Sequence, residues 1–193
     1  MKRLRNLYKG KDIIVCGCGP SIAELPESLP IPTIGVNDVW AYHQTRYIML
    51  QDSPQAFEKK RVQRILDSKP EAWLLSKICA RTWDKAKMPR KPQYIYDPIR
   101  VPGAQITTPS LAVGVAMFMG AKRVGVIGVD LTDHHNLSKR IPQVQRGFKE
   151  LLACAWCFGV EIWNLSQQSQ LDIVPTMTLK KFMAGVPQAL AAD

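Results

Sequence analysis

Four short apolar runs of this sequence end in small or polar residues that could contact a ligand. The residues that follow these runs are Gly17, Gly19, Pro20 and Ser21; Asn37 and Asp38; Gln51 and Asp52; and Gly128 and Asp130. Glycines let backbone amides approach a phosphate, and serine can donate a hydrogen bond to it. Ligands of an open parallel sheet bind beyond the carboxyl ends of its strands. The recurrence therefore predicts a binding site at that edge.

The first of these segments, Gly17-Cys18-Gly19-Pro20-Ser21, is the best candidate for binding a phosphate. It lacks the third glycine of the dinucleotide-binding fingerprint and the Gly-Lys-Ser/Thr of a Walker loop. A plain tight turn is the alternative, because glycine and proline mark turns generally.

A second candidate is the polar stretch of residues 131–140, which follows Asp130 and contains Asp133, His134 and His135. Histidine titrates near neutral pH, so His134 or His135 could take a proton from an acceptor hydroxyl. The same Asp-His-His group could hold a divalent metal, or it could be a solvated loop in which Asp133 caps a turn.

Two further carboxylates have both a functional and a structural interpretation. Asp38 and Asp52 could bind a ribose hydroxyl or a metal, and Asp52 could equally cap the next helix, because Ser53-Pro54 follows it. His43 fits a structural role better, and the cysteines fit core or surface thiols. Trp83 could stack on a base or sugar or belong to the core.

The elements that must position these residues alternate between strands and helices. The expected strands are 13–16, 34–36, 47–50, 72–75, 124–127 and 160–163, and the expected helices are 53–67, 111–119, 142–158 and 179–184. This alternation predicts an α/β, Rossmann-like fold with a mainly parallel sheet flanked by helices. We expect a single domain over 1–193, with the irregular, basic segment 77–106 as a lid or insertion.

Composition narrows the class of protein. The chain has 193 residues and a formal net charge of +10, and residues 59–100 hold twelve basic and four acidic side chains. Such a patch attracts anions, including nucleotide phosphates, nucleic acid and anionic membranes, or serves only solubility. Without a membrane-spanning run, a signal peptide or an even cysteine count, a cytoplasmic protein with reduced thiols is expected.

The motif series resembles that of a known Rossmann-like superfamily. The matching segments are Gly17-Cys-Gly-Pro-Ser-Ile22, Gly35-Val-Asn37-Asp38, Thr107-Thr-Pro-Ser-Leu111, Gly128-Val-Asp130 and Gly159-Val-Glu-Ile-Trp163-Asn-Leu-Ser166. Similar series occur in the family 42 sialyltransferases, the Maf flagellin glycosylation proteins and the archaeal 6-hydroxymethylpterin pyrophosphokinases. The resemblance covers most of residues 11–183.

The resemblance to the sialyltransferases implies that Gly19, Pro20, Ser21 and Asn37 hold a cytidine nucleotide donor. The stretch with Thr107, Thr108 and Ser110 matches their donor-contacting turn but lacks its glycine. A late histidine is the general base of those enzymes, which implies His134 or His135. Resemblance to the pyrophosphokinases would instead imply Mg²⁺ held by Asp52, Asp130 and Asp133.

The leading prediction is a nucleotide-dependent transferase that moves a sugar from a cytidine nucleotide to a hydroxyl. Arg81, Arg90 and Arg100 would stabilise the departing phosphate, and no cofactor is required. A Mg²⁺-dependent pyrophosphokinase-like ATP enzyme and a non-catalytic nucleotide- or nucleic-acid-binding module are the alternatives. The expected partner is a nucleotide or nucleotide-sugar; nucleic acid is possible but not favoured.

Overall fold

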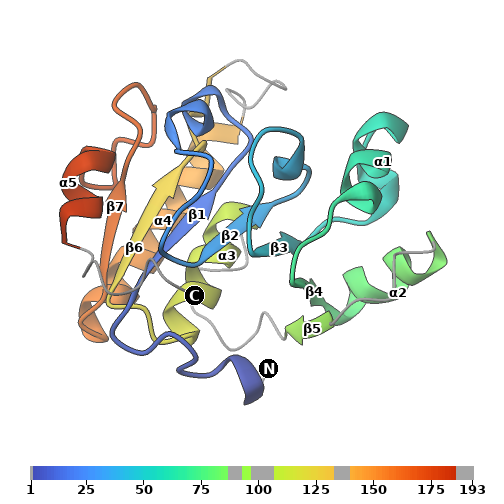
Figure 1. Cartoon of the computed structure of the whole chain (residues 1–193), viewed down its shortest axis with the longest axis horizontal. Coiled ribbons are helices and arrows are strands. Elements are labelled where there is room, and N and C mark those ends of the chain that lie inside the picture. The colour runs from blue at the N-terminus through green and yellow to red at the C-terminus, as the bar shows by residue number, and fades with distance from the viewer. Residues whose placement is uncertain (1, 87–92, 97–106, 133–139, 186–193) are drawn as a thin grey trace.

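The computed structural model describes residues 2–86, 93–96, 107–132 and 140–185, and its centre is one parallel sheet (Figure 1). Seven strands form it: β1 (Asp12–Cys16), β2 (Thr33–Val36), β3 (Tyr47–Leu50), β4 (Ala72–Ser76), β5 (Gln93–Tyr96), β6 (Arg123–Ile127) and β7 (Glu161–Asn164). They lie in the order β5-β4-β3-β2-β1-β6-β7, and every pair is parallel. The predicted α/β, Rossmann-like fold is confirmed.

Helices cover both faces of the sheet (Figure 1). They are α1 (Lys59–Asp67), α2 (Lys77–Lys85), α3 (Thr108–Phe118), α4 (Ile141–Cys157) and α5 (Leu179–Ala184), with short 3₁₀ helices η1 (Lys2–Leu4), η2 (Pro20–Glu24), η3 (Val39–Ala41) and η4 (Pro54–Ala56). No helix in the described ranges is long and apolar enough to cross a membrane.

Alternating side chains of the strands build two layers of core. Ile13 and Val15 of β1 face α3 and α4, whereas Ile14 and Cys16 face the side that holds α5. On this second face, β3 and β4 pack against α1 and α2. The strands are buried on both sides, which explains why they read as continuous apolar runs in the sequence.

The strand order reverses between β1 and β6. The chain runs from β1 outward to β5, then crosses back to place β6 on the other side of β1. In open parallel sheets, ligands bind at the carboxyl ends of the strands, near such a switch point. The predicted binding residues that follow β1, β2 and β6 all lie at this edge.

Three sequence-based predictions need correction. Residues 77–85 and 93–96 are not irregular lid: they form α2 and the edge strand β5, while 87–92 and 97–106 lie outside the described residues. The helix expected over 53–67 is not continuous: the 3₁₀ helix η4 ends at Ala56, and α1 begins at Lys59. The helix expected from 111 begins at Thr108, and its N-cap is Thr107, whose hydroxyl accepts from the Ser110 N–H in a capping box.

Candidate functional site

The turn after β1 packs directly against the loop after β6. The amide of Gly17 donates to the Ile127 carbonyl and that of Gly19 to the Gly128 carbonyl, each at 2.7 Å. A Cβ on Gly17 would lie 2.2 Å from the Gly128 oxygen. The glycines of this turn therefore let two loops touch.

Ser21 and Asp130 join the same two loops. The Asp130 carboxylate accepts from the Ser21 N–H at 2.8 Å and from its hydroxyl at 2.6 Å, while that hydroxyl accepts from the Gly128 N–H at 2.9 Å. Both side chains are buried. The amides of Gly19 and Ser21 are thus already bonded within the protein, so a phosphate contact through them, or a catalytic role of Asp130, stays a prediction.

Asn37 ends β2 with an unusual backbone. Its φ of 55° lies in the left-handed region, which asparagine tolerates better than most residues. Its side-chain Oδ1 is buried and accepts no hydrogen bond from any residue that the structure describes. A buried acceptor of this kind costs free energy unless a donor reaches it, so it indicates a position for a ligand N–H or O–H.

Leu131, in the loop after β6, also has a left-handed backbone, with φ of 57°. For a bulky side chain this conformation costs roughly 1–3 kcal/mol, and such strain gathers at functional sites. Two of the three described non-glycine residues with positive φ, Asn37 and Leu131, therefore lie at the carboxyl edge.

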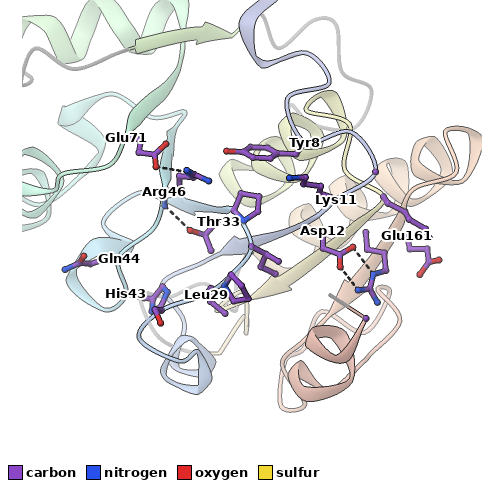
Figure 2. A pocket seen from close by; sticks show the side chains of 18 of the residues that line it. Tyr8, Lys11, Asp12, Leu29, Thr33, His43, Gln44, Arg46, Glu71 and Glu161 are labelled. Atoms are coloured by element: carbon purple, nitrogen blue, oxygen red, sulfur yellow. Dashed lines mark hydrogen bonds and ion pairs between the residues drawn. The ribbon is translucent and has the colours of Figure 1, made fainter. Parts of the chain in front are cut away.

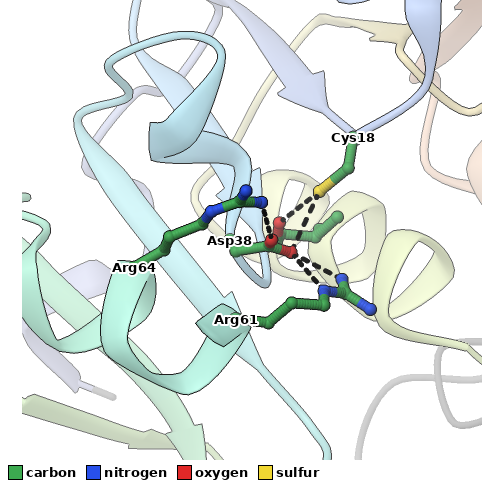
Figure 3. A network of polar contacts seen from close by, with 5 residues as sticks. Cys18, Asp38, Arg61 and Arg64 are labelled. Atoms are coloured by element: carbon green, nitrogen blue, oxygen red, sulfur yellow. Dashed lines mark hydrogen bonds and ion pairs between the residues drawn. The ribbon is translucent and has the colours of Figure 1, made fainter. Parts of the chain in front are cut away.

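Asp38 is the centre of a charged network beside the turn (Figure 3). Arg61 reaches from α1 to its Oδ1 through Nε at 3.0 Å and Nη2 at 2.5 Å, and Arg64 lies 3.5 Å from Oδ2. The Cys18 thiol approaches from the other side, 3.8 Å from Oδ1 and 3.4 Å from the Val36 carbonyl. Asp38 is 1% exposed, so these partners replace water around its charge.

The network fixes the protonation of its members. Burial alone would raise the pKa of Asp38, but the hydrogen bonds and positive charge of Arg61, with Arg64, outweigh burial and lower it. Burial and the Asp38 charge raise the pKa of Cys18 to about 12. Asp38 is thus an anion and Cys18 a neutral thiol at neutral pH, and the carboxylate is engaged by arginines rather than open to a ribose or a metal.

The other residues predicted to bind a nucleotide lie after β3 and at the start of α3. Asp52 is exposed, Gln51 is half-buried, and the Asp52 carbonyl accepts from Trp83 Nε1 at 2.9 Å. Trp83 is wholly buried, so its suggested stacking on a ligand is wrong. Ser110 and Thr108 are buried at the start of α3, and Ser110 bonds to Thr107 within the cap.

The anion-binding and catalytic side chains are only partly placed. Arg81 is exposed on α2, whereas Arg90, Arg100, His134 and His135 lie outside the described residues. Among the described residues, no group of three His, Cys, Asp or Glu side chains could hold a metal ion. Arg61 and Arg64 were not predicted from the sequence as site residues, although both belong to the basic patch of residues 59–100. The available signal was their spacing of three, which places them on one face of a helix.

A groove of 1260 Å³ lies at the opposite edge of the sheet (Figure 2). It is lined by residues at or just before the strand starts, including Asp12, Arg46 and Glu71. Arg46 pairs with Glu71, and Asp12 with Arg123, so much of its charge is internally neutralised. It contains none of the residues predicted to bind a nucleotide, and it is at the amino rather than the carboxyl ends.

Comparison with known proteins finds similarity in structure alone. No protein-family model and no curated protein matches the sequence. The sialyltransferase CstII of Campylobacter jejuni, solved with cytidine-5'-monophosphate, superposes with a TM-score of 0.55 and 15% identity, over 87% of this chain and 85% of that one. The alpha-2,3-sialyltransferase of the same organism gives 0.53 and 16% identity, over 86% and 80%.

A Maf glycosyltransferase of Magnetospirillum magneticum AMB-1 is also similar. It gives a TM-score of 0.63 at 11% identity, over 95% of this chain and 35% of the larger protein. At such identities the likeness shows the fold. The chain therefore has the Rossmann-like fold of these sialyltransferases and of the Maf glycosyltransferase.

Proposed function

We propose that the protein is a glycosyltransferase that uses a nucleotide-sugar donor, with cytidine as the nucleoside. The observation that carries this proposal is the shared fold with a sialyltransferase solved with cytidine-5'-monophosphate, which extends over most of both chains. Another of these sialyltransferase structures holds a trisaccharide acceptor together with CMP, so that protein accommodates the nucleotide and an acceptor at once. The site of this chain would lie at the carboxyl ends of β1, β2 and β6.

Asn37 supports the proposal from within the chain. Its buried Oδ1 is free to accept a hydrogen bond from a ligand, and the cytosine amino group and the ribose hydroxyls are suitable donors. The positive φ holds the side chain at the end of β2. We assign Asn37 the role of binding the nucleoside, and His134 or His135 that of accepting the proton of the acceptor hydroxyl as it attacks the sugar.

Calorimetric titration with CMP, UMP, AMP and ATP, each with and without Mg²⁺, tests the nucleotide. We expect CMP to bind most tightly and Mg²⁺ to change its affinity little. Binding of ATP that requires Mg²⁺ would favour the pyrophosphokinase-like alternative instead. Release of CMP from a CMP-sugar, followed over time, then tests transfer or hydrolysis, and binding without any turnover would leave a binding module.

Two matched variants test Asn37. Asn37→Gly removes the side chain while keeping a residue that tolerates the positive φ, and Asn6→Gly makes the same change at φ 59° in the exposed segment before β1. Loss of a hydrogen bond should weaken CMP binding about 5- to 10-fold in Asn37→Gly. Equal CMP affinity in both variants would refute the assigned role.

A further inference from the structure

The glycine turn leaves few donors for a phosphate. The Gly17 amide donates to the last residue of β6, the amides of Gly19 and Ser21 donate to the loop after β6, and Pro20 has no amide hydrogen. A nucleotide bound at this edge brings at least one phosphate, so its negative charge needs another partner. Arg61 and Arg64 lie beside the turn, because they bind the same Asp38 carboxylate that the Cys18 thiol of the turn contacts.

Arg61 is held as a binding group rather than as a flexible surface side chain. Its Nε and Nη2 both donate to one oxygen of Asp38, and its guanidinium carbon lies 5.2 Å from the centre of the Phe57 ring. The side chain is 19% exposed, against 38% for Arg64. Two contacts thus fix the plane of the guanidinium, which reduces the entropy lost on binding.

The same geometry leaves donors unused. Nη1 of Arg61 donates to no residue in the described part of the chain, and the single charge of Asp38 faces two arginines. The Cys18 thiol beside them is neutral. The network therefore carries one positive charge in excess. It lies next to the turn after β1, and its Asp38 directly follows Asn37, whose Oδ1 has no partner among the described residues. An anion is the group that would balance it.

We propose that Arg61, held in place by Asp38 and Phe57, binds the phosphate of the nucleotide. This proposal rests on the proposed function, and it makes Asp38 a positioning residue for Arg61 instead of a ligand of ribose or metal. Asn37 and Arg61 then divide the ligand: the first binds the nucleoside and the second its phosphate.

Titration of CMP and cytidine into the whole protein tests this division. In Arg61→Gln we expect the CMP affinity to fall about 10- to 100-fold, as for loss of a charged hydrogen bond, while the cytidine affinity stays unchanged. Arg61→Lys keeps the charge without the planar fork and should recover part of the loss. Arg46→Gln, which removes an arginine paired with Glu71 at the amino edge, is the matched control and should bind CMP normally.

Arg61→Gln leaves the buried Asp38 carboxylate with Arg64 as its one charged partner, so a second variant guards against misfolding. Asp38→Asn/Arg61→Gln replaces the pair by neutral groups, and it should show the same loss of CMP at unchanged cytidine affinity. If Arg61→Gln and this double variant bind CMP like the wild type, or lose CMP and cytidine equally, the proposal is overturned while the proposed function stands.

A pyrophosphate titration separates the two ideas if no cytidine nucleotide binds. Pyrophosphate binding that weakens about tenfold or more in Arg61→Gln, but not in Arg46→Gln, would support the anion site although the proposed function had failed. If pyrophosphate binds neither the wild type nor Arg61→Gln, or binds both equally, the anion site is overturned together with the proposed function.

Discussion

Replacing Ser21 by alanine tests whether the turn after β1 is built for stability or for ligand contact. The Ser21 hydroxyl donates to the Asp130 carboxylate and accepts from the Gly128 amide, and it is buried. Alanine fits the same backbone but removes both bonds. Within the described part of the chain, the Gly128 N–H then has no hydrogen-bond partner, and Asp130 keeps one bond, from the Ser21 amide.

The size of the loss follows from these contacts. A hydrogen bond to a charged group contributes about 1.5–3 kcal/mol, and a buried amide left without a partner costs about 1–3 kcal/mol. Because neighbouring effects do not add fully, we expect Ser21→Ala to lower the free energy of unfolding by about 3 kcal/mol. For a chain of this size, the melting temperature should fall by roughly 6–12 °C.

Urea unfolding followed by circular dichroism measures the change, with the exposed Ser28→Ala as a control expected to stay within about 0.5 kcal/mol. Asp130→Asn should cost a similar amount, and the double variant should cost little more than the larger single change. A loss below about 1 kcal/mol in Ser21→Ala, with weakened nucleotide binding, would show that the hydroxyl serves the ligand and that our structural reading is mistaken.

Three other predictions concern the same edge of the sheet. Folding lowers the pKa of Asp38, so this carboxylate stabilises the protein above its unfolded pKa of about 3.9, and the stabilisation is lost as the pH falls through the folded value. The variant Asp38→Asn should therefore flatten the decline in melting temperature between pH 5 and pH 2. An unchanged decline would contradict this. Gly17→Ala places a methyl group against the Gly128 carbonyl and should cost about 1–3 kcal/mol in urea unfolding, whereas a neutral effect would mean that the two loops separate easily. Iodoacetamide at pH 8 should label the exposed Cys157 and spare Cys18, whose pKa is about 12, as peptide mass spectrometry would show. Rapid labelling of Cys18 in the folded protein would refute the raised pKa of this thiol.

The central strands were predictable because burial on both faces leaves a simple pattern. Ile13 to Cys16 and Val124 to Ile127 are uninterrupted apolar runs, and each ends in glycine at the switch point. The helix α2 was missed because lysines and arginines interrupt its pattern. Its buried residues Cys79, Ala80 and Trp83 nevertheless have the spacing of one helical turn.

The position of the candidate site was predictable, but its internal bonds were not. Strand ends in a parallel sheet share one edge, which places Ser21, Asn37 and Asp130 there from the sequence alone. The bond between Ser21 and Asp130 joins residues 109 positions apart, and Arg61 reaches Asp38 because α1 packs beside η3. Such pairings depend on how distant elements dock, which no local pattern encodes.

The placement of β6 beside β1 has a consequence for how the chain folds. Asp12 pairs in register with Arg123, and their side chains form an ion pair across 111 positions of sequence. During synthesis, β1 to β5 emerge before β6. The hydrogen-bonding groups on the β6 side of β1 therefore stay unpaired until β6 has been made. Closing so long a loop slows folding, and until it closes the β1 edge is open to pairing with other chains. Variants that weaken the β1–β6 contact should therefore aggregate during synthesis more than their loss of equilibrium stability implies.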